Sequence, residues 1–256
     1  MELEMVSGPS ALLWDVDGTL AETELEGHRL AFNRAFAECG LCWQWDVAAY
    51  QQLLRISGGR ERISAFLSEV EGAVPDPERV ERLQLAKQRH YNALVEQGVL
   101  RLRTGVERLI RSAREAGLAQ AIVTTSSRRA VEALLDRLLP DHAACFGLWV
   151  CGEDVPQKKP DPAAYALALA RLDLPAQGAI ALEDSGNGVA AATGAGLTTV
   201  VTLSASSANE APDAFASAAV VLDHLGDPAQ PNCVQRGPTC PQGQVTLSYL
   251  QLLLPA

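Results

Sequence analysis

Ala11-Leu12-Leu13-Trp14-Asp15-Val16-Asp17-Gly18-Thr19 is the stretch that decides the fold. Its short apolar run predicts a buried strand over residues 11–16. Asp15 and Asp17 then stand at the carboxyl end of this strand, where open α/β sheets place their ligand crevice. Two carboxylates this close repel each other unless a cation or a proton separates them, and Gly18 lets the chain turn beside a ligand. A metal site and a simple acidic turn are both consistent with these residues.

Further strands of the same kind follow. They are short, apolar and rich in β-branched residues, and they cover residues 121–125, 147–151, 179–182 and 198–203, with a weaker candidate at 218–222. Helical patterns lie between several of them, over residues 106–116, 128–139 and 162–172. This alternation predicts an α/β fold in which helices cover both faces of a parallel sheet.

The first two strands are separated by about 100 residues, too many for one connection between neighbouring strands. Apolar residues recur there at helical spacing, with no convincing strand between them. We therefore predict a helical cap over residues 23–103, inserted into a core made of residues 1–22 and 104–225. Residues 226–256 form a tail, for which docking on the core and self-association are both open.

The overall composition limits the partners. The chain has 256 residues and a net charge of −10, which argues against a nucleic-acid partner and repels phosphate at long range. A phosphorylated substrate must therefore meet locally concentrated cations. No apolar run approaches the ~18 residues of a membrane span, and residues 1–10 lack the features of a secretory signal. We expect a cytoplasmic monomer without membrane contact.

The pair Cys39 and Cys42 has the only spacing among the six cysteines that is typical of metal or redox sites. It has no second such pair, and it does not stand between a strand and a helix. Buried structural thiols are therefore the favoured interpretation.

A second acidic cluster, Glu183-Asp184, ends another predicted strand in a position equivalent to that of Asp15. Mg²⁺ prefers hard oxygen ligands in octahedral geometry, and carboxylates from two strand ends suit it. Taken alone, this cluster would be an ordinary capped turn. Taken with the first cluster, it gives a candidate set of metal ligands: Asp15, Asp17, Glu183 and Asp184.

Two further segments supply groups that bind phosphate. Thr125 and Ser126 end a predicted strand and precede a helix, so that their hydroxyl and amide groups would face an anion at the helix N-terminus. Lys159 stands before Pro160, where it can neutralise a phosphoryl group and a nucleophilic carboxylate together. Plain helix capping and a solvated loop are the respective alternatives.

These four segments, in this order, resemble the haloacid dehalogenase superfamily of phosphatases over residues 11–225. The resemblance implies a Rossmann-like parallel core with an inserted α-helical cap, and a bound Mg²⁺. It implies that Asp15 is the nucleophile and that Asp17 is the general acid and base and lends a backbone carbonyl to the metal. It further implies that Thr125, or Thr124 one residue earlier, binds phosphate, and that an aspartyl phosphate forms. The remaining implied site residues are Lys159 and the metal-site acids Glu183 and Asp184.

Two stretches of the cap bear on the substrate. Glu24, His28 and Arg29 come shortly after the nucleophile loop, while two glycines followed by Arg60 and Arg62 could hold a second phosphate. A solvated helix face is the alternative for the two arginines. Both stretches resemble the CbbY-type branch of the superfamily, which implies a small phosphorylated sugar as substrate and hydrolysis of xylulose 1,5-bisphosphate to xylulose 5-phosphate.

Three other functions fit parts of the pattern. A β-phosphoglucomutase-like enzyme would share the core and cap but return the phosphoryl group to a sugar. A phosphoglycolate phosphatase would have little use for the loop that contains Arg60 and Arg62. A non-catalytic phosphate-sensing protein would not need the cap together with Asp15, Asp17, Lys159 and Asp184.

Overall fold

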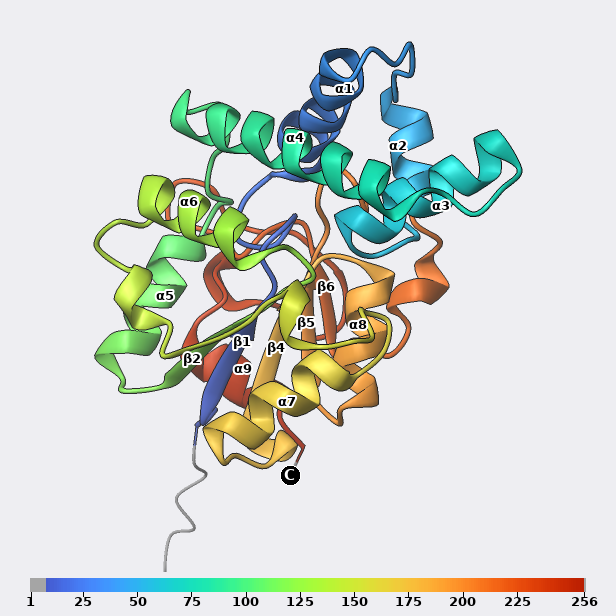
Figure 1. Cartoon of the computed structure of the whole chain (residues 1–256). Coiled ribbons are helices and arrows are strands. Elements are labelled where there is room, and N and C mark those ends of the chain that lie inside the picture. Colours follow the sequence, from blue (N-terminus) through green and yellow to red (C-terminus); the bar gives the residue numbers. More distant parts are fainter. Residues whose placement is uncertain (1–7, 256) are drawn as a thin grey trace, which may run out of the picture.

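The computed structural model of the chain describes residues 8–255, so residues 1–7, used above for the core and for the secretory signal, and residue 256 of the tail lie outside it. The described residues form a seven-stranded sheet with a layer of helices above one end of it (Figure 1). The strand order is β3-β2-β1-β4-β5-β6-β7, and only the pairing of β6 with β7 is antiparallel. The strands are β1 (Ala11–Trp14), β2 (Ala119–Val123), β3 (Leu148–Val150), β4 (Ala179–Glu183), β5 (Thr198–Thr202), β6 (Val220–Leu222) and β7 (Val234–Arg236).

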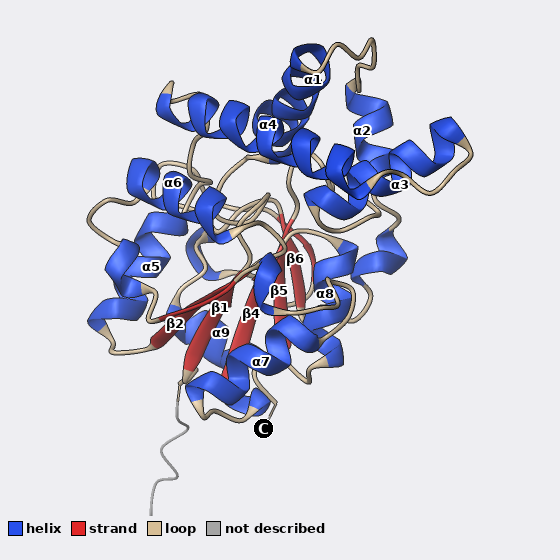
Figure 2. Cartoon of the chain, in the orientation of Figure 1, coloured by secondary structure: helices blue, strands red, loops and turns tan. Residues whose placement is uncertain are grey.

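Helices cover both faces of the sheet (Figure 2). Leu12 and Trp14 of β1 pack into the cluster of α5, α6 and α9, whereas Ala11 and Leu13 face the cluster that contains α7 and α8. This alternation is that of a strand buried on both sides. The α-helices of the described residues are α1 (Arg29–Glu38), α2 (Val47–Leu53), α3 (Gly59–Glu71), α4 (Pro77–Glu96), α5 (Val106–Glu115), α6 (Arg128–Leu138), α7 (Ala163–Leu172), α8 (Gly186–Gly194) and α9 (Leu247–Leu253).

The predicted α/β fold is confirmed, and all six predicted strands are present, but several are shorter than predicted. Strand β1 ends at Trp14 because the following residues fold into a tight loop. The carbonyl oxygen of Val16 accepts the N–H groups of Thr19 and Leu20, at 3.2 and 2.9 Å. Val16 is buried without pairing in the sheet, so its apolar side chain extended the predicted strand too far.

Helices α1 to α4 form the cap and have an apolar cluster of their own, rich in aromatic residues. Phe32, Phe36 and Trp45 are buried at its centre, with ring centroids 4.8 to 6.4 Å apart. The second half of α4 packs on α6 of the core. The chain crosses between core and cap twice, and Ala21 and Leu102 pair in an isolated antiparallel bridge at the two crossings. The exact domain boundaries at residues 23, 103 and 225 stay a prediction.

The described part of the tail packs on the core. Residues 234–236 form the edge strand β7, and Tyr249 and Leu250 of α9 are buried in the core cluster beside α5. The described part of the tail is therefore docked on the core. No helix within residues 8–255 combines the length and the apolar character that a membrane span needs.

The interpretation of Cys39 and Cys42 as buried thiols is wrong. Both are exposed, because they lie at the end of α1 and in the loop that follows it on the outside of the cap. The buried thiols among the described residues are instead Cys151 and Cys240.

Candidate active site

The loop after β1 carries the first two carboxylates of the site. The backbone N–H of Asp15 donates to the carbonyl oxygen of Leu182 in β4 at 3.0 Å, which joins the ends of the two strands. Gly18 has a φ of +86°, and a Cβ atom there would lie 2.1 Å from Asp184 Oδ2. Only glycine therefore allows this loop to lie directly against Asp184.

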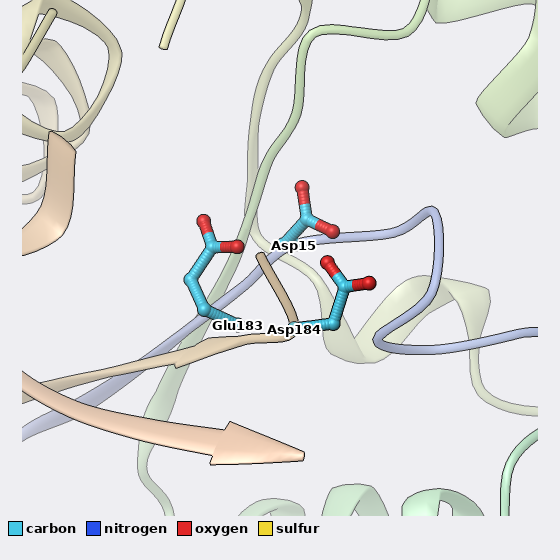
Figure 3. A group of neighbouring side chains, drawn as sticks. All are labelled: Asp15, Glu183 and Asp184. Carbon is cyan, nitrogen blue, oxygen red and sulfur yellow. The ribbon is translucent and has the colours of Figure 1, made fainter. Parts of the chain in front are cut away.

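Three buried carboxyl groups meet at the ends of β1 and β4 (Figure 3). Asp15, Glu183 and Asp184 each offer an oxygen atom, and these atoms lie within 4.8 Å of one another. Burial raises the pKa of Asp15 to about 7, and it also raises the pKa of Asp184 well above its usual range. Glu183 Oε2 is buried and has no hydrogen-bond partner among the described residues. An orphaned oxygen among mutually repelling carboxylates fits a divalent cation.

Lys159 supplies the positive charge beside this cluster. Its ammonium group donates to Asp15 Oδ1 at 2.8 Å, to Glu183 Oε1 at 2.7 Å and to the carbonyl oxygen of Val123 at 2.8 Å. Burial alone would lower the pKa of Lys159, but the two carboxylates raise it above its usual value. Tyr165 of α7 lies beneath, where its hydroxyl donates to Glu183 Oε1 at 2.5 Å.

Asp17 is not one of the three clustered carboxyl groups, and its side chain bonds to other residues. Its Oδ1 accepts the Thr23 hydroxyl at 2.6 Å and lies 2.8 Å from His28 Nε2, while its Oδ2 accepts the Ser126 hydroxyl at 2.5 Å. Burial alone would raise the pKa of Asp17, but His28 and the two hydroxyl donors hold it well below its usual range. The Asp17 side chain is therefore kept ionised within the loop that follows β1.

Lys87 of α4 completes a buried chain of groups behind Asp17. Its Nζ lies 2.8 Å from His28 Nδ1, and the His28 ring stacks on Tyr91 with centroids 4.2 Å apart. Burial lowers the pKa of Lys87 to about 8, so at pH 7 the lysine is mostly a protonated ammonium group, which can donate a hydrogen bond to His28 Nδ1.

A cavity of about 380 Å³ opens between core and cap above these groups. Asp15, Asp17, Thr125 and Lys159 line its core side, and Glu24, Arg55 and Arg62 line its cap side. The guanidinium group of buried Arg62 donates to the Tyr50 hydroxyl at 3.0 Å, and that hydroxyl donates to Glu24 Oε2 at 2.5 Å. Glu24 and Arg62 thus belong to one preorganised network.

Four of the six predicted substrate ligands do not line this cavity: His28, Arg29, Arg60 and Ser126. Arg60 is exposed and pairs with Glu81, and it lines a neighbouring cavity of about 590 Å³. Arg29 donates to the carbonyl oxygens of Leu25 and Trp45, at 3.2 and 3.3 Å, and thereby ties cap segments together.

The two neighbouring threonines differ in their surroundings. The Thr124 side chain is buried, and its hydroxyl accepts the Ser126 N–H at 3.1 Å. Thr125 lines both cavities. The neighbouring cavity also has Ser126 in its wall.

The cap lies in direct contact with the loops of the core that carry the site. Asn187 at the start of α8 donates to the Arg55 carbonyl at 3.2 Å and to the Ser57 hydroxyl at 3.1 Å. Gln51 of α2 donates to the Ala205 carbonyl at 3.3 Å. These bonds join the cap to the core beside the cavity, which Gln51, Ser57 and Asn187 also line.

Residues 9–196 match the family of haloacid dehalogenase-like hydrolases. The chain belongs to this family. The hydrolase is 44% identical over 231 residues to the plasmid-encoded protein CbbY of Cupriavidus necator, covering 86% of this chain and 87% of that protein. Its structure resembles CbbY from Rhodobacter sphaeroides in complex with phosphate, with a TM-score of 0.78, 42% identity and coverage of 84% of this chain and 94% of the other.

A second crystal structure contains a variant of the same Rhodobacter sphaeroides CbbY in complex with xylulose-(1,5)bisphosphate. It is 41% identical, has a TM-score of 0.78 and covers 85% of this hydrolase and 96% of that chain. With relatives of this kind, the haloacid dehalogenase-like hydrolase is a phosphatase of the CbbY-like branch. A non-catalytic phosphate sensor is excluded.

The sequence analysis of this hydrolase missed several residues of the site: Thr23, Tyr50, Arg55, Lys87, Tyr165 and Ser204, whose hydroxyl donates to Asp184. Lys87 left a sequence pattern, because it occupies one position of the buried stripe of α4 that also contains Val80 and Leu83. Hydroxyl donors such as Tyr165 leave no such pattern, because their role depends on which carboxylate the fold brings beside them.

Proposed function

We propose that this protein hydrolyses xylulose 1,5-bisphosphate to xylulose 5-phosphate with Mg²⁺ and an aspartyl-phosphate intermediate. The observation that carries the proposal is that one cavity is lined by Asp15 and Lys159 on its core side and by Arg62 and Arg55 on its cap side. Such a cavity can hold one phosphate for transfer and a second for recognition. The relative bound to a bisphosphate of this kind supports the choice of substrate.

We assign the cation site to Asp15, Glu183 and Asp184, with Asp17 contributing through its backbone carbonyl. All these donors are oxygen atoms, which favours Mg²⁺ over softer metals. When bound, Mg²⁺ supplies charge neutralisation to the phosphoryl oxygens. Its charge would also lower the pKa of Asp15 from about 7, which makes the carboxylate available as a nucleophile at neutral pH.

Asp15 then attacks the phosphorus atom in line with the leaving sugar oxygen, and a phosphorus–oxygen bond to the carboxylate replaces the bond to the sugar. Lys159, already 2.8 Å from Asp15 Oδ1, keeps the carboxylate oriented and offsets the charge that develops. Thr125 binds the phosphoryl group, and Ser126 also lies beside it.

Asp17 moves the proton in both halves of the reaction. Its depressed pKa keeps the carboxylate ionised, so it is free to accept a proton from the water that hydrolyses the aspartyl phosphate. In the first half it must instead protonate the leaving oxygen. We expect the substrate oxygen to displace one of the donors Ser126 and Thr23, which raises the pKa of Asp17 for that step.

The second phosphate lies beside Arg62 in this proposal. Arg62 is buried and held by Tyr50, so it presents its guanidinium group with little loss of side-chain entropy. Glu24 accepts hydroxyl groups of the sugar, and His28 acts through Asp17. Arg60 and Arg29 are less suited to bind the second phosphate, because neither lines this cavity.

A panel of sugar monophosphates and bisphosphates with Mg²⁺, scored as kcat/KM, tests the proposal. We expect xylulose 1,5-bisphosphate to be the best substrate and Asp15→Asn to abolish turnover in a folded protein. Arg62→Met should lower kcat/KM for bisphosphates at least tenfold more than for monophosphates, whereas its control Arg60→Met should not discriminate. Equal losses on both classes would count against the second phosphate site.

Formation of glucose 6-phosphate from β-glucose 1-phosphate would instead favour the phosphomutase, and a preference for phosphoglycolate would favour that phosphatase. We further propose that the protein is a cytoplasmic monomer without a nucleic-acid partner, as its net charge of −10 supports.

A further inference from the structure

Arg103 lies at the second crossing between cap and core and makes an unusual number of hydrogen bonds. Its side chain is 7% exposed, and its Nε pairs with Glu22 at 2.9 Å. The two terminal nitrogens donate to five acceptors, four of which are backbone carbonyl oxygens. These acceptors are the carbonyl oxygens of Gly18, Thr202, Leu203 and Asp223 and the hydroxyl of Thr202.

The acceptors belong to the last residue of β5, Thr202, and to the loops that follow β1, β5 and β6 at the carboxyl edge of the sheet. Two of these loops support Asp184. Gly18 is in such close contact that a Cβ atom would lie 2.1 Å from Asp184 Oδ2. Ser204, which follows Leu203, donates its hydroxyl to the same oxygen at 2.6 Å. Arg103 therefore binds the two chain segments between which the Asp184 carboxylate is held.

We propose that Arg103 is a positioning residue that keeps Asp184 in the geometry required to bind the cation. The inference rests on the cation site assigned under the proposed function. Arg103 does not line the cavity that contains Asp15 and Lys159. It fixes the Gly18 carbonyl on one side of Asp184 and the chain at Leu203 on the other, so that the carboxylate cannot turn away when its neighbours Asp15 and Glu183 repel it.

The geometry of the guanidinium group explains why this position requires arginine. Five acceptors spread over three loops need a planar group with diverging N–H donors, whereas a lysine has three donors on one atom. Arg103→Lys keeps the positive charge beside Glu22 but cannot reach all three loops. It therefore separates the positioning role from the charge.

Arg108, near the start of helix α5, offers a matched control. It also donates to backbone carbonyl oxygens of the core, at Leu225 and Gly226, and pairs with Asp227 at 3.3 Å. None of its acceptors belongs to a loop that touches Asp184. Arg108→Met thus removes a comparable set of hydrogen bonds near the second crossing between cap and core, without loosening the cation site.

The test measures Mn²⁺ binding to the intact protein without substrate, by electron paramagnetic resonance, because Mn²⁺ accepts the same oxygen ligands as Mg²⁺. We expect Arg103→Lys and Arg103→Met to weaken Mn²⁺ binding about tenfold or more. With saturating Mg²⁺, kcat should fall by a similar factor while KM for the sugar phosphate changes less than about twofold. Arg108→Met should match the wild type in both measurements.

If Arg103→Met fails to fold, the Mn²⁺ affinity of Arg103→Lys alone tests the inference. Mn²⁺ affinity within about twofold of the wild type in folded Arg103→Lys would overturn the inference, as would an equal loss in Arg108→Met. A wild-type protein that binds no Mn²⁺ or Mg²⁺ would instead refute the cation site of the proposed function, and the inference with it.

Discussion

Replacing Lys87 by methionine should make the protein more stable at neutral pH and less active. Lys87 is a buried ammonium group that lies over the Phe32 and Tyr91 rings, with Nζ 5.1 and 5.2 Å from their centroids. Burial lowers its pKa from 10.5 to about 8, which is a shift of about 2.5 units. At about 1.4 kcal/mol per unit, keeping the charge costs the fold about 3 kcal/mol at pH 7.

The sign and the pH window follow from proton binding. Between pH 8 and 10.5 the unfolded chain binds more protons at Lys87 than the folded protein does, so the stability of the wild type rises across this range. Methionine removes the cost but also loses the hydrogen bond to His28, worth about 1 kcal/mol. The variant should therefore gain about 2 kcal/mol in free energy of unfolding at pH 7, and the gain should shrink and reverse towards pH 10.5.

Urea unfolding at several pH values measures this difference. The control is Arg82→Met on the exposed side of the same helix, which should stay within about 0.5 kcal/mol of the wild type. We also expect kcat to fall about tenfold, because His28 loses the partner that holds its ring towards Asp17. A variant that is less stable than the wild type at pH 7, or a gain that does not depend on pH, would refute the reasoning.

Other changes test the remaining contacts of the site. Tyr165→Phe removes the hydroxyl that orients Glu183, so Mg²⁺ affinity in calorimetric titration should fall about tenfold, and an unchanged affinity would argue against this role. Gly188→Ala places a methyl group 1.8 Å from Glu183 Oε2, so activity should be lost even at saturating Mg²⁺; recovery with added Mg²⁺ would contradict this. Ser126→Ala removes a donor that lowers the pKa of Asp17, so the alkaline limb of the kcat/KM profile, which reports the acid that protonates the leaving oxygen, should move to higher pH rather than stay in place.

The core of the site could be predicted because parallel strands bring their carboxyl ends to one edge of a sheet. Asp15 follows β1 and Glu183 ends β4, and the neighbouring strands pair in register from Ala11 to Trp14. Any sequence with acidic residues after two such strands places them together. Proximity of these carboxylates therefore needed no knowledge of side-chain packing.

The cap was less predictable, because helix rotation decides which side chains face the cavity. Arg60 and Arg62 are two residues apart on α3, so they point in directions about 200° apart. Arg62 faces the core of the cap beside Ile63 and Leu67, whereas Arg60 faces outward and pairs with Glu81. The residue types around the two glycines could not show which of these arginines faces the cavity.

The edge strand of the tail was missed for a different reason. Residues 234–236 form only three residues of strand, and Gln235 and Arg236 are exposed. A short polar segment of this kind becomes a strand only when another strand offers its edge, here β6. Its conformation depends on long-range pairing rather than on local propensity.

The sheet extends well beyond the part of the chain that the family match covers. The match ends at residue 196, whereas β5, β6 and β7 all lie between residues 198 and 236. A recombinant fragment cut at residue 196 would leave β4 with an unpaired edge, and such edges promote aggregation. It would also lose Ser204, which donates to Asp184. The shortest fragment worth expressing therefore includes β7, although the recognisable motifs end much earlier.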